Sequence, residues 1–410
     1  MVNRGLFIQH IRKLRKTFTC AMLMLAVWMA PGVVAAQLEE AKMDYVRVAT
    51  FNVSMDATNY LPPTKWVSEG SQALRQALQT QHHQVRNIAE IIQRTRPHIL
   101  VLNEFDYLPR EQGIDVFLRD YLQVAQDGQA PIDYPYVYLA PVNTGQPSGF
   151  DLNRDGKVTA FENDAWGFGY YPGQYGMVVL SQFPIQTTAV RTFQQFKWQD
   201  MPGHLVPKIP TTGEPWYSAD VMEKMPLSSK SHWDVPIDIN GTTVHVLVSH
   251  PTPPVFDGPE NRNGIKNHDE VRFWADYINQ TEANYIYDDN GERGGLKPHQ
   301  RFIIAGDLNA SIEGTANVPG TIEQLLEHPL IQAEPIPTSE GGMANSNSPY
   351  AAQHTATWGK RADYLLPSLY GIKVQASGVF WPLDNELAHL FATRDATSDH
   401  RLVWLDIELR

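Results

Sequence analysis

Apolar residues along this chain fall into two alternating patterns, which together predict a mixed α/β architecture. Short runs rich in β-branched residues and leucine, such as 45–53 and 99–102, are typical of buried strands. Between them, residues 71–96 carry apolar side chains at helical spacing and stop at Pro97, which predicts a helix. This strand–helix–strand rhythm indicates layered α/β packing. Further strands are expected at 175–180, 235–239, 243–249, 301–305, 364–366, 372–376 and 402–409, and a further helix at 263–282.

The segments that connect these elements are of two kinds. Asn240-Gly241 favours a tight hairpin between two strands, because both central positions of such a turn need positive φ. Residues 141–174 are rich in Gly, Pro and Asn, and residues 194–232 are rich in Pro, Lys and Trp. Both long stretches lack the strand–helix rhythm, so we expect insertions over one rim and not separate domains.

Polar side chains stand at the ends of several predicted strands. The set comprises Asn52, Glu104, His250, Asp307, Asn309, Asp399 and His400. Because strand ends gather along one edge of a sheet, these side chains are expected to cluster. Carboxylates, amides and histidines collected there make a hard-cation site with acid/base partners, which suits hydrolysis of a phosphate ester.

Taken singly, most of these residues have a simpler explanation. Asn52 alone could form an Asx turn after its strand, and Glu104 alone could be a solvated strand end. His250 precedes a proline and could be a packed loop residue, and Asp363 could be a structural partner of Arg361. The hypothesis of a shared site therefore depends on the whole set.

The first 36 residues have the pattern of an export signal. Five basic residues precede an apolar stretch at 21–34, and Val34-Ala35-Ala36 offers small residues for cleavage before Gln37. A retained membrane anchor is the alternative, but the apolar run is short for a spanning helix and contains Pro31. We therefore expect a mature domain of residues 37–410, secreted or periplasmic, without stable membrane insertion.

Removal of the signal would change both the thiol content and the charge of the chain. Cys20 is the only cysteine, so the mature chain would have no disulfide and no thiolate catalysis. It would keep 28 Lys and Arg against 45 Asp and Glu, a net charge of −17. Such a surface repels long polyanions, which disfavours a nucleic-acid partner, although a local basic patch could override the total.

The motif order resembles that of the endonuclease/exonuclease/phosphatase superfamily, the fold of deoxyribonuclease I, neutral sphingomyelinases and inositol polyphosphate phosphatases. The resemblance spans roughly residues 44–410. It implies a four-layer α/β sandwich, with two packed mixed β-sheets flanked by helices and the site on the upper rim. The matching motifs are Asn52, Glu104, Gly306-Asp307-Leu308-Asn309, Arg361-Ala362-Asp363-Tyr364 and Ser398-Asp399-His400.

The resemblance also implies a metal site. Glu104 and Asp399 would hold a divalent cation, Mg²⁺ or Mn²⁺, with Asn52 beside it. A phosphate ester repels an anionic nucleophile, so its charge must be neutralised before attack. A carboxylate-held Mg²⁺ with open positions does this and polarises the P–O bond.

The same resemblance implies roles for the remaining polar residues. Asp307 and Asn309 would orient the attacking water and the phosphoryl oxygens, so Asn309, like Asn52, would also contact substrate. His400 would contact the phosphate as an imidazolium held by Asp363, and His250 would be the general acid for the leaving oxygen. A carboxylate partner fixes the tautomer of a histidine and raises its pKa.

A second metal site is predicted by residues 151–162, which match a full EF-hand calcium loop. Gly156 stands at the sharp turn and Val158 is the apolar eighth residue. No flanking helices are evident, so a structural calcium clip for the insertion is favoured over a sensor; the alternative is a Gly-turned acidic loop without metal. The expected Ca²⁺ ligands are Asp151, Asn153, Asp155, Lys157, Thr159 and Glu162.

The segment after His250 bears on the substrate. Prolines stiffen a rim loop there, and Arg262 and His268 could grip a second phosphate or a polar head group. A rigid loop followed by a capped helix explains the same residues without a ligand.

These observations favour an exported, metal-dependent phosphatase or phosphodiesterase acting on a small or soluble phosphate ester, expected to be a monomer. One alternative is an extracellular deoxyribonuclease or other endonuclease. Another is a catalytically silent, calcium-dependent binding module.

Overall fold

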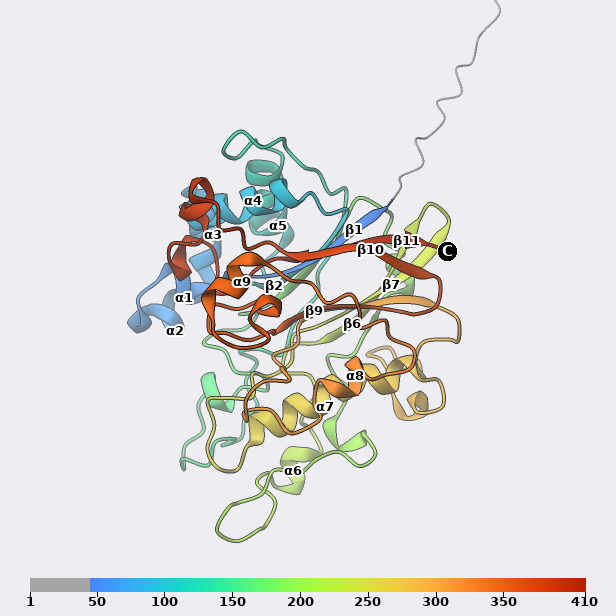
Figure 1. Ribbon diagram of the computed structural model, residues 1–410. Helices are drawn as coiled ribbons and strands as arrows, with labels where there is room; N and C mark the ends of the chain where they lie inside the picture. Colours follow the sequence, from blue (N-terminus) through green and yellow to red (C-terminus); the bar gives the residue numbers. More distant parts are fainter. Residues whose placement is uncertain (1–44) are drawn as a thin grey trace, which may run out of the picture. The chain divides into compact units, whose positions relative to one another are not determined.

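The computed structural model describes residues 45–410, in which eleven strands form two mixed sheets (Figure 1). The first sheet has the order β10-β11-β1-β2-β4-β3 and the second the order β5-β6-β7-β8-β9. The β1–β2 and β7–β8 pairs are parallel and the other neighbours are antiparallel. The strands are β1 Val46–Met55, β2 Ile99–Phe105, β3 Tyr136–Tyr138, β4 Met177–Ser181, β5 Arg191–Thr192, β6 His232–Ile239, β7 Thr242–Ser249, β8 Arg301–Asp307, β9 Asp363–Pro367, β10 Ile372–Val379 and β11 Val403–Leu409.

Two long helices and several short ones cover the sheets. The long ones are α4, His83–Thr95, and α7, Arg262–Ile278. The short ones are α1 Ala57–Tyr60, α2 Trp66–Glu69, α3 Ala73–Gln79, α5 Ile114–Phe117, α6 Ala219–Met222, α8 Glu323–Leu326 and α9 Glu340–Asn345. Within residues 45–410 no helix is both long and apolar enough to cross a membrane. The predicted export signal and Cys20 lie outside the described residues.

Alternation along the strands produces the layers. On β1, Phe51 packs in a cluster with the apolar face of α4, while Val48 faces the opposite way and packs between the sheets. On β8, Ile304 packs in a cluster with α7 residues, while Ile303 joins the core between the sheets. Period-two alternation with both faces apolar requires cover on both sides. The predicted fold, two packed mixed sheets flanked by helices, is confirmed.

The predicted helix at 71–96 is two helices. α3 ends at Gln79, Gln81 adopts a left-handed φ of 55°, and the His82 side chain caps the first turn of α4. The break between the two helices follows from the sequence, because six polar residues separate Leu78 from the next apolar residue. A continuous helix would have placed a full turn without core contacts in this gap, so the first helix ends there and a second one begins.

The other elements match more closely. Asn240 and Gly241 both have positive φ, 52° and 85°, as the predicted hairpin requires. The predicted helix 263–282 ends four residues early, at Ile278. Residues 141–174 contain a 3₁₀ turn and isolated bridges, and 194–232 contain α6 and short turns. The assignment of these two stretches as insertions in one domain stays a prediction.

His232, at the start of β6, is a histidine whose burial favours its neutral form, against the opposing effect of its hydrogen bond to a backbone carbonyl. Its Nε2 lies 2.9 Å from the Glu270 carbonyl oxygen, which only accepts, and its Nδ1 lies 2.6 Å from the Ser228 hydroxyl. The ring packs against Phe273 and Trp274 at centroid distances of 4.7 and 5.0 Å. Burial lowers the pKa of His232 to about 4.

This environment predicts a loss of stability in acid. Because the folded pKa of His232 lies below the unfolded value, its contribution is complete above about pH 6.5 and is lost as the pH falls toward 4. The full loss is about 3 kcal/mol, from about 1.4 kcal/mol per pKa unit. Urea unfolding of the wild type and of His232→Gln between pH 7 and 4 should show a shallower pH slope in the variant. Equal slopes would contradict this account.

Candidate active site

The strand directions place the polar residues at one edge of the two sheets. Asn52, Glu104 and Asp307 lie on β1, β2 and β8 at or near their carboxyl ends, and His250 directly follows β7. β9 and β11 run antiparallel to their neighbours, so their amino ends reach the same edge. Asp363 begins β9, and Asp399 and His400 precede β11.

Asp307 is the centre of this cluster. Its Oδ2 accepts a hydrogen bond from Asn52 Nδ2 at 3.0 Å. The same oxygen lies 3.4 Å from His250 Nε2 and 3.7 Å from His400 Nε2. Its Oδ1 accepts from the Asn309 backbone N–H at 2.9 Å. The structure therefore brings four predicted residues together around the carboxylate of a fifth, which is 1% exposed.

Charge on Asp307 is favoured despite its burial. Burial alone would raise the pKa of Asp307, but the His400 imidazolium, the His250 ring and the Asn52 amide together hold it below its usual range. The carboxylate therefore stays ionised and can only accept hydrogen bonds.

His400 is held in its charged form by two acids. Its Nδ1 lies 2.8 Å from Asp363 Oδ2, and Thr355 Oγ1 donates to the same oxygen at 2.6 Å. Burial would lower the pKa of His400, but the carboxylates of Asp363 and Asp307 raise it well above the ordinary value. Trp358 covers the other side of the ring edge-on, at a centroid distance of 5.9 Å.

His250, unlike His400, is neutral in the free protein. Burial, followed by the nearby Lys230 cation, lowers the pKa of His250 to about 4. Its Nδ1 is buried and has no hydrogen-bond partner in the described chain. The free protein therefore holds a neutral His250 beside a charged His400, a difference that the motifs alone did not indicate.

Negative charge also gathers beside this cluster, where Glu104 Oε1 lies 3.9 Å from His250 Nε2. Burial raises the pKa of Glu104 to about 7, and the carboxylates of Asp56 and Asp399 add to this effect. Asp56 is fully buried, and its Oδ2 has no partner among residues 45–410. Asp399 accepts from Ser54 Oγ at 3.2 Å and lies 3.4 Å from the Arg394 guanidinium. Clustered carboxylate oxygens with an unpartnered member fit a small divalent cation.

Asn103 is a site residue that the sequence motifs did not single out. Its Oδ1 accepts from the Asp307 backbone N–H at 3.1 Å, and its Nδ2 donates to the Ser249 carbonyl at 3.4 Å. It therefore joins β2 of the first sheet to β7 and β8 of the second. The only signal in the sequence was an amide within an apolar strand, where a partner is required.

Arg262 and His268 have partners of their own. Arg262 forms an ion pair with Glu260, and its guanidinium stacks on Trp216 at 5.6 Å. His268 Nδ1 lies 2.9 Å from Asp269 Oδ1. Neither residue joins the cluster around Asp307, so their predicted contact with substrate stays a prediction.

The calcium loop forms a turn closed by its own side chains. Asp151 accepts from the Gly156 backbone N–H at 2.8 Å, and Gly156 has a φ of 84°. Asp164, which the motif does not include, accepts from the N–H groups of Leu152 at 2.8 Å and Thr159 at 2.7 Å. A 3₁₀ turn follows the loop in place of a helix. Calcium binding itself stays a prediction.

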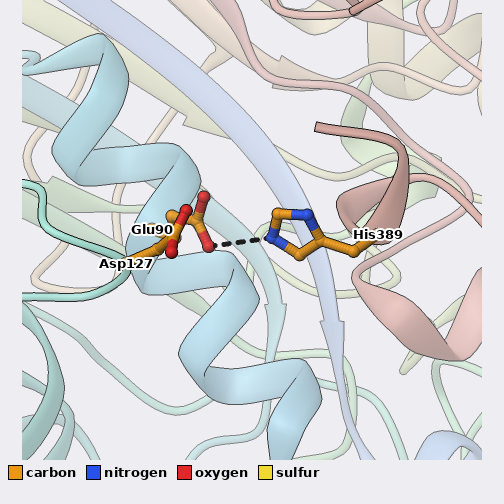
Figure 2. Close-up of side chains that lie close together, drawn as sticks. All are labelled: Glu90, Asp127 and His389. Carbon is orange, nitrogen blue, oxygen red and sulfur yellow. Dashed lines mark hydrogen bonds and ion pairs between the residues drawn. The ribbon is translucent and has the colours of Figure 1, made fainter. Parts of the chain in front are cut away.

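A further cluster with two acidic residues joins Glu90 of α4 to Asp127 and His389, which lie outside that helix. Figure 2 shows Glu90 and Asp127 side by side, with a contact of 3.2 Å from Glu90 to His389 Nε2. Arg94 already pairs with Glu90 at 2.7 Å and with Asp127 at 3.0 Å. Because the arginine pairs with both acids, we interpret this cluster as a charge network and assign no metal to it.

Comparison with protein families gives a match over residues 49–400 to the Endonuclease/Exonuclease/phosphatase family. The chain belongs to this family. No curated protein matches it significantly. The members of the family share the hydrolysis of phosphate esters, which agrees with the carboxylate, amide and histidine set at the sheet edge.

Several solved structures are similar to this chain at low sequence identity. An endonuclease/exonuclease/phosphatase from Beutenbergia cavernae is 16% identical, with 89% of this chain and 72% of that chain covered and a TM-score of 0.47. The human nocturnin catalytic domain with bound sulfate is 13% identical, covering 89% and 95%, with a TM-score of 0.43. Sphingomyelinase C from Streptomyces griseocarneus is 15% identical, covering 88% and 99%, with a TM-score of 0.42.

Gly306 permits the close approach of β7 and β8 just before Asp307. It has a φ of 145°, and a Cβ there would lie 2.1 Å from the Ser249 carbonyl oxygen. Gly306→Ala should therefore lower the free energy of unfolding by roughly 2–4 kcal/mol in urea denaturation. Gly128→Ala is the matched control, since Gly128 has a φ of 74° and nothing within 4 Å. Equal losses in the two variants would argue against the contact with Ser249.

Proposed function

We propose that this protein is an exported, divalent-metal-dependent phosphoesterase that hydrolyses mono- or diesters of a small or soluble substrate by attack of water on phosphorus. The observation that carries the proposal is the convergence on the Asp307 carboxylate of Asn52, His250, Asn309 and His400. An ionised carboxylate, a charged histidine and a neutral histidine within one hydrogen-bonded group supply the acid/base chemistry of ester hydrolysis. Export is supported by the residue pattern of segment 1–36.

Glu104 and Asp399, with Asn52 beside them, are the residues proposed to hold Mg²⁺ or Mn²⁺. Burial, followed by the carboxylates of Asp56 and Asp399, raises the pKa of Glu104, and the buried Asp56 Oδ2 has no partner among the described residues; a divalent cation would offset this negative charge. When bound, the ion would neutralise the phosphoryl oxygens and polarise the bond to the leaving group.

The residues around Asp307 divide the remaining tasks. Asp307 stays ionised and orients the attacking water by accepting its hydrogen bond. His400, charged and fixed by Asp363, donates to a phosphoryl oxygen. His250 is the group assigned to protonate the leaving oxygen. It is neutral in the free protein, and an anionic ester beside it would favour its charged form.

The acidic surface favours a small substrate over a polymer. Loss of segment 1–36 would leave a net charge of −17, and binding to long nucleic acids depends on Lys and Arg that neutralise successive phosphates. Digestion of plasmid DNA at low salt with Mg²⁺ separates the two classes of enzyme, because a phosphatase or small-molecule phosphodiesterase leaves the DNA intact. Turnover of any nitrophenyl ester would eliminate a silent binding module.

Asp307→Asn keeps the size of the central side chain and removes its charge. With Mg²⁺, turnover of bis-nitrophenyl phosphate or nitrophenyl phosphate should fall by roughly 10²–10⁴-fold, and a chelator should abolish wild-type turnover. Asp127→Asn is the matched control, because the same change falls in the charge network that Asp127 forms with Arg94 and Glu90. Retention of more than a tenth of wild-type turnover by Asp307→Asn would contradict the proposal.

A structural calcium ion in the loop 151–162 is the second part of the proposal. Six loop positions offer oxygen ligands, and the turn at Gly156 is already formed by the Asp151 side chain. Because the loop lies within the insertion and has no helix pair, its expected effect is on stability.

Asp151→Ala should remove most of the calcium-dependent gain in thermal stability. Calcium at about 100 times its Kd should add about 2.7 kcal/mol to wild-type stability. Asp164→Asn is the matched control, because it breaks the ties to Leu152 and Thr159 and should lower the melting temperature with and without calcium. Thermal melts with calcium and with a chelator measure both. An equal calcium-dependent gain in wild type and Asp151→Ala would exclude the clip.

A further inference from the structure

Glu270 joins two segments that approach the active site from different strands. This carboxylate on α7 is 0% exposed. Its Oε1 accepts from the Ser229 backbone N–H and its Oε2 from the Thr252 backbone N–H, each at 2.6 Å. Ser229 Oγ donates to the His250 carbonyl at 3.4 Å. The segment before β6 is therefore held against the segment that carries His250.

Two neighbours of Glu270 on the same face of α7 hold the adjoining residues. Asn267 Nδ2 donates to the carbonyls of Thr252 at 2.9 Å and Leu308 at 3.0 Å. Trp274 Nε1 donates to Ser249 Oγ at 2.9 Å. Positions 267, 270 and 274 have the i, i+3, i+7 spacing of one helix face. One rigid helix thus sets the segments around residues 229, 250 and 308.

The residue that this arrangement delivers to the site is Lys230. It follows Ser229 directly, and only 5% of its surface is exposed. Among residues 45–410, no group accepts a hydrogen bond from its Nζ, and both oxygens of Glu270 are engaged by backbone N–H groups. The Nζ atom itself keeps some exposed surface and makes no hydrogen bond within the described residues, so an incoming acceptor can reach it.

The charges that act on the Lys230 ammonium include those of the catalytic groups. After burial, which lowers the pKa of Lys230, the acting charges are the carboxylates of Glu270, Glu104 and Asp307, which raise it. The positive charge of Lys230 in turn helps to lower the pKa of His250. Lys230 adjoins Ser229, which contacts both the His250 carbonyl and Glu270, so the geometry and the charge effects agree in placing Lys230 near the catalytic groups.

An anionic substrate needs such a cation here. The pocket contains the carboxylates of Glu104, Asp307 and Asp399, and His400 is already paired with Asp363. Phosphate esters carry one or two negative charges, and lysine is a compact point charge suited to phosphoryl oxygens. We propose that Lys230 is a substrate-binding residue whose ammonium contacts a non-bridging phosphoryl oxygen, and that Glu270 positions it. This inference rests on the proposed function, of which it names one further contact.

The test is calorimetric binding of inorganic phosphate in the presence of Mg²⁺. Lys230→Met removes the charge and keeps the side-chain length, and it should raise the Kd for phosphate at least tenfold, about 1.4 kcal/mol. Lys230→Arg should bind phosphate within about threefold of wild type, because it keeps a cation at the same place. The Kd for Mg²⁺ alone should not rise in Lys230→Met, since the substitution removes a cation from beside the carboxylates.

Lys266→Met is the matched control. Lys266 is also buried and also lies near Glu270, but its Nζ donates to the Trp166 carbonyl at 3.2 Å. Its loss should leave the phosphate Kd within about twofold of wild type. Equal phosphate binding by wild type and Lys230→Met, or equal weakening by Lys266→Met, would overturn the assignment, as would absence of phosphate binding by the wild type.

Turnover is measured separately on nitrophenyl esters, where Lys230→Met should raise KM more than it lowers kcat. A wild-type protein that binds phosphate through Lys230 but hydrolyses no ester would refute the proposed function and leave this contact standing. An active enzyme whose KM and phosphate Kd are both unchanged in Lys230→Met would refute the Lys230 contact and leave the proposed function standing.

Discussion

The whole site depends on a carboxylate that stays charged inside the protein. An ionised group with 1% exposure is costly unless its surroundings supply donors and positive charge. Asp307 receives hydrogen bonds from the Asn52 side chain and the Asn309 backbone, and the His400 imidazolium lies beside it. These partners come from different strands and from both sheets. The two sheets must therefore pack in one register before the charge can be accommodated.

A few contacts between the two sheets fix this register. Asn103 crosses from β2 to the backbone of β7 and β8, and Gly306 lets those last two strands approach each other. Around them the core between the sheets is built from β-branched residues and leucine. A small number of polar contacts thus fixes the position of Asp307 within a frame whose stability comes mainly from apolar burial.

Much of the fold could be predicted from the sequence because it rests on periodicity. Runs such as 99–102 and 243–249 are strands, and the hairpin at Asn240-Gly241 follows from its backbone requirement. The break between α3 and α4 was missed because apolar spacing resumes in phase after a polar gap. The polar gap can be seen in the sequence, but whether the helix continues through it depends on the tertiary packing.

The candidate site was predictable only in part, because some of its residues act through contacts with segments that are distant in sequence. Residues at strand ends, such as Asp307 and His400, could be recognised because their type and position are unusual next to an apolar run. Asn103 and Glu270 act through backbone groups of segments remote in sequence. The amide of Asn103 within an apolar strand indicates that a partner is required but not which one, and Glu270 carries no local signal. The contrast between a neutral His250 and a charged His400 depends on burial and on neighbours that only the three-dimensional arrangement supplies.

The helix face that carries Glu270 has a counterpart directed toward the 194–232 stretch. Asp269, next to Glu270, accepts hydrogen bonds from Trp198 Nε1 at 2.7 Å and from the Leu205 backbone at 2.8 Å. A shift or rotation of α7 by less than a side-chain length would move the segments around 229, 250 and 308 in concert. Through Asp269 and Glu270, α7 therefore couples the packing of the 194–232 stretch, whose Trp198 is fully buried, to the position of the site residues.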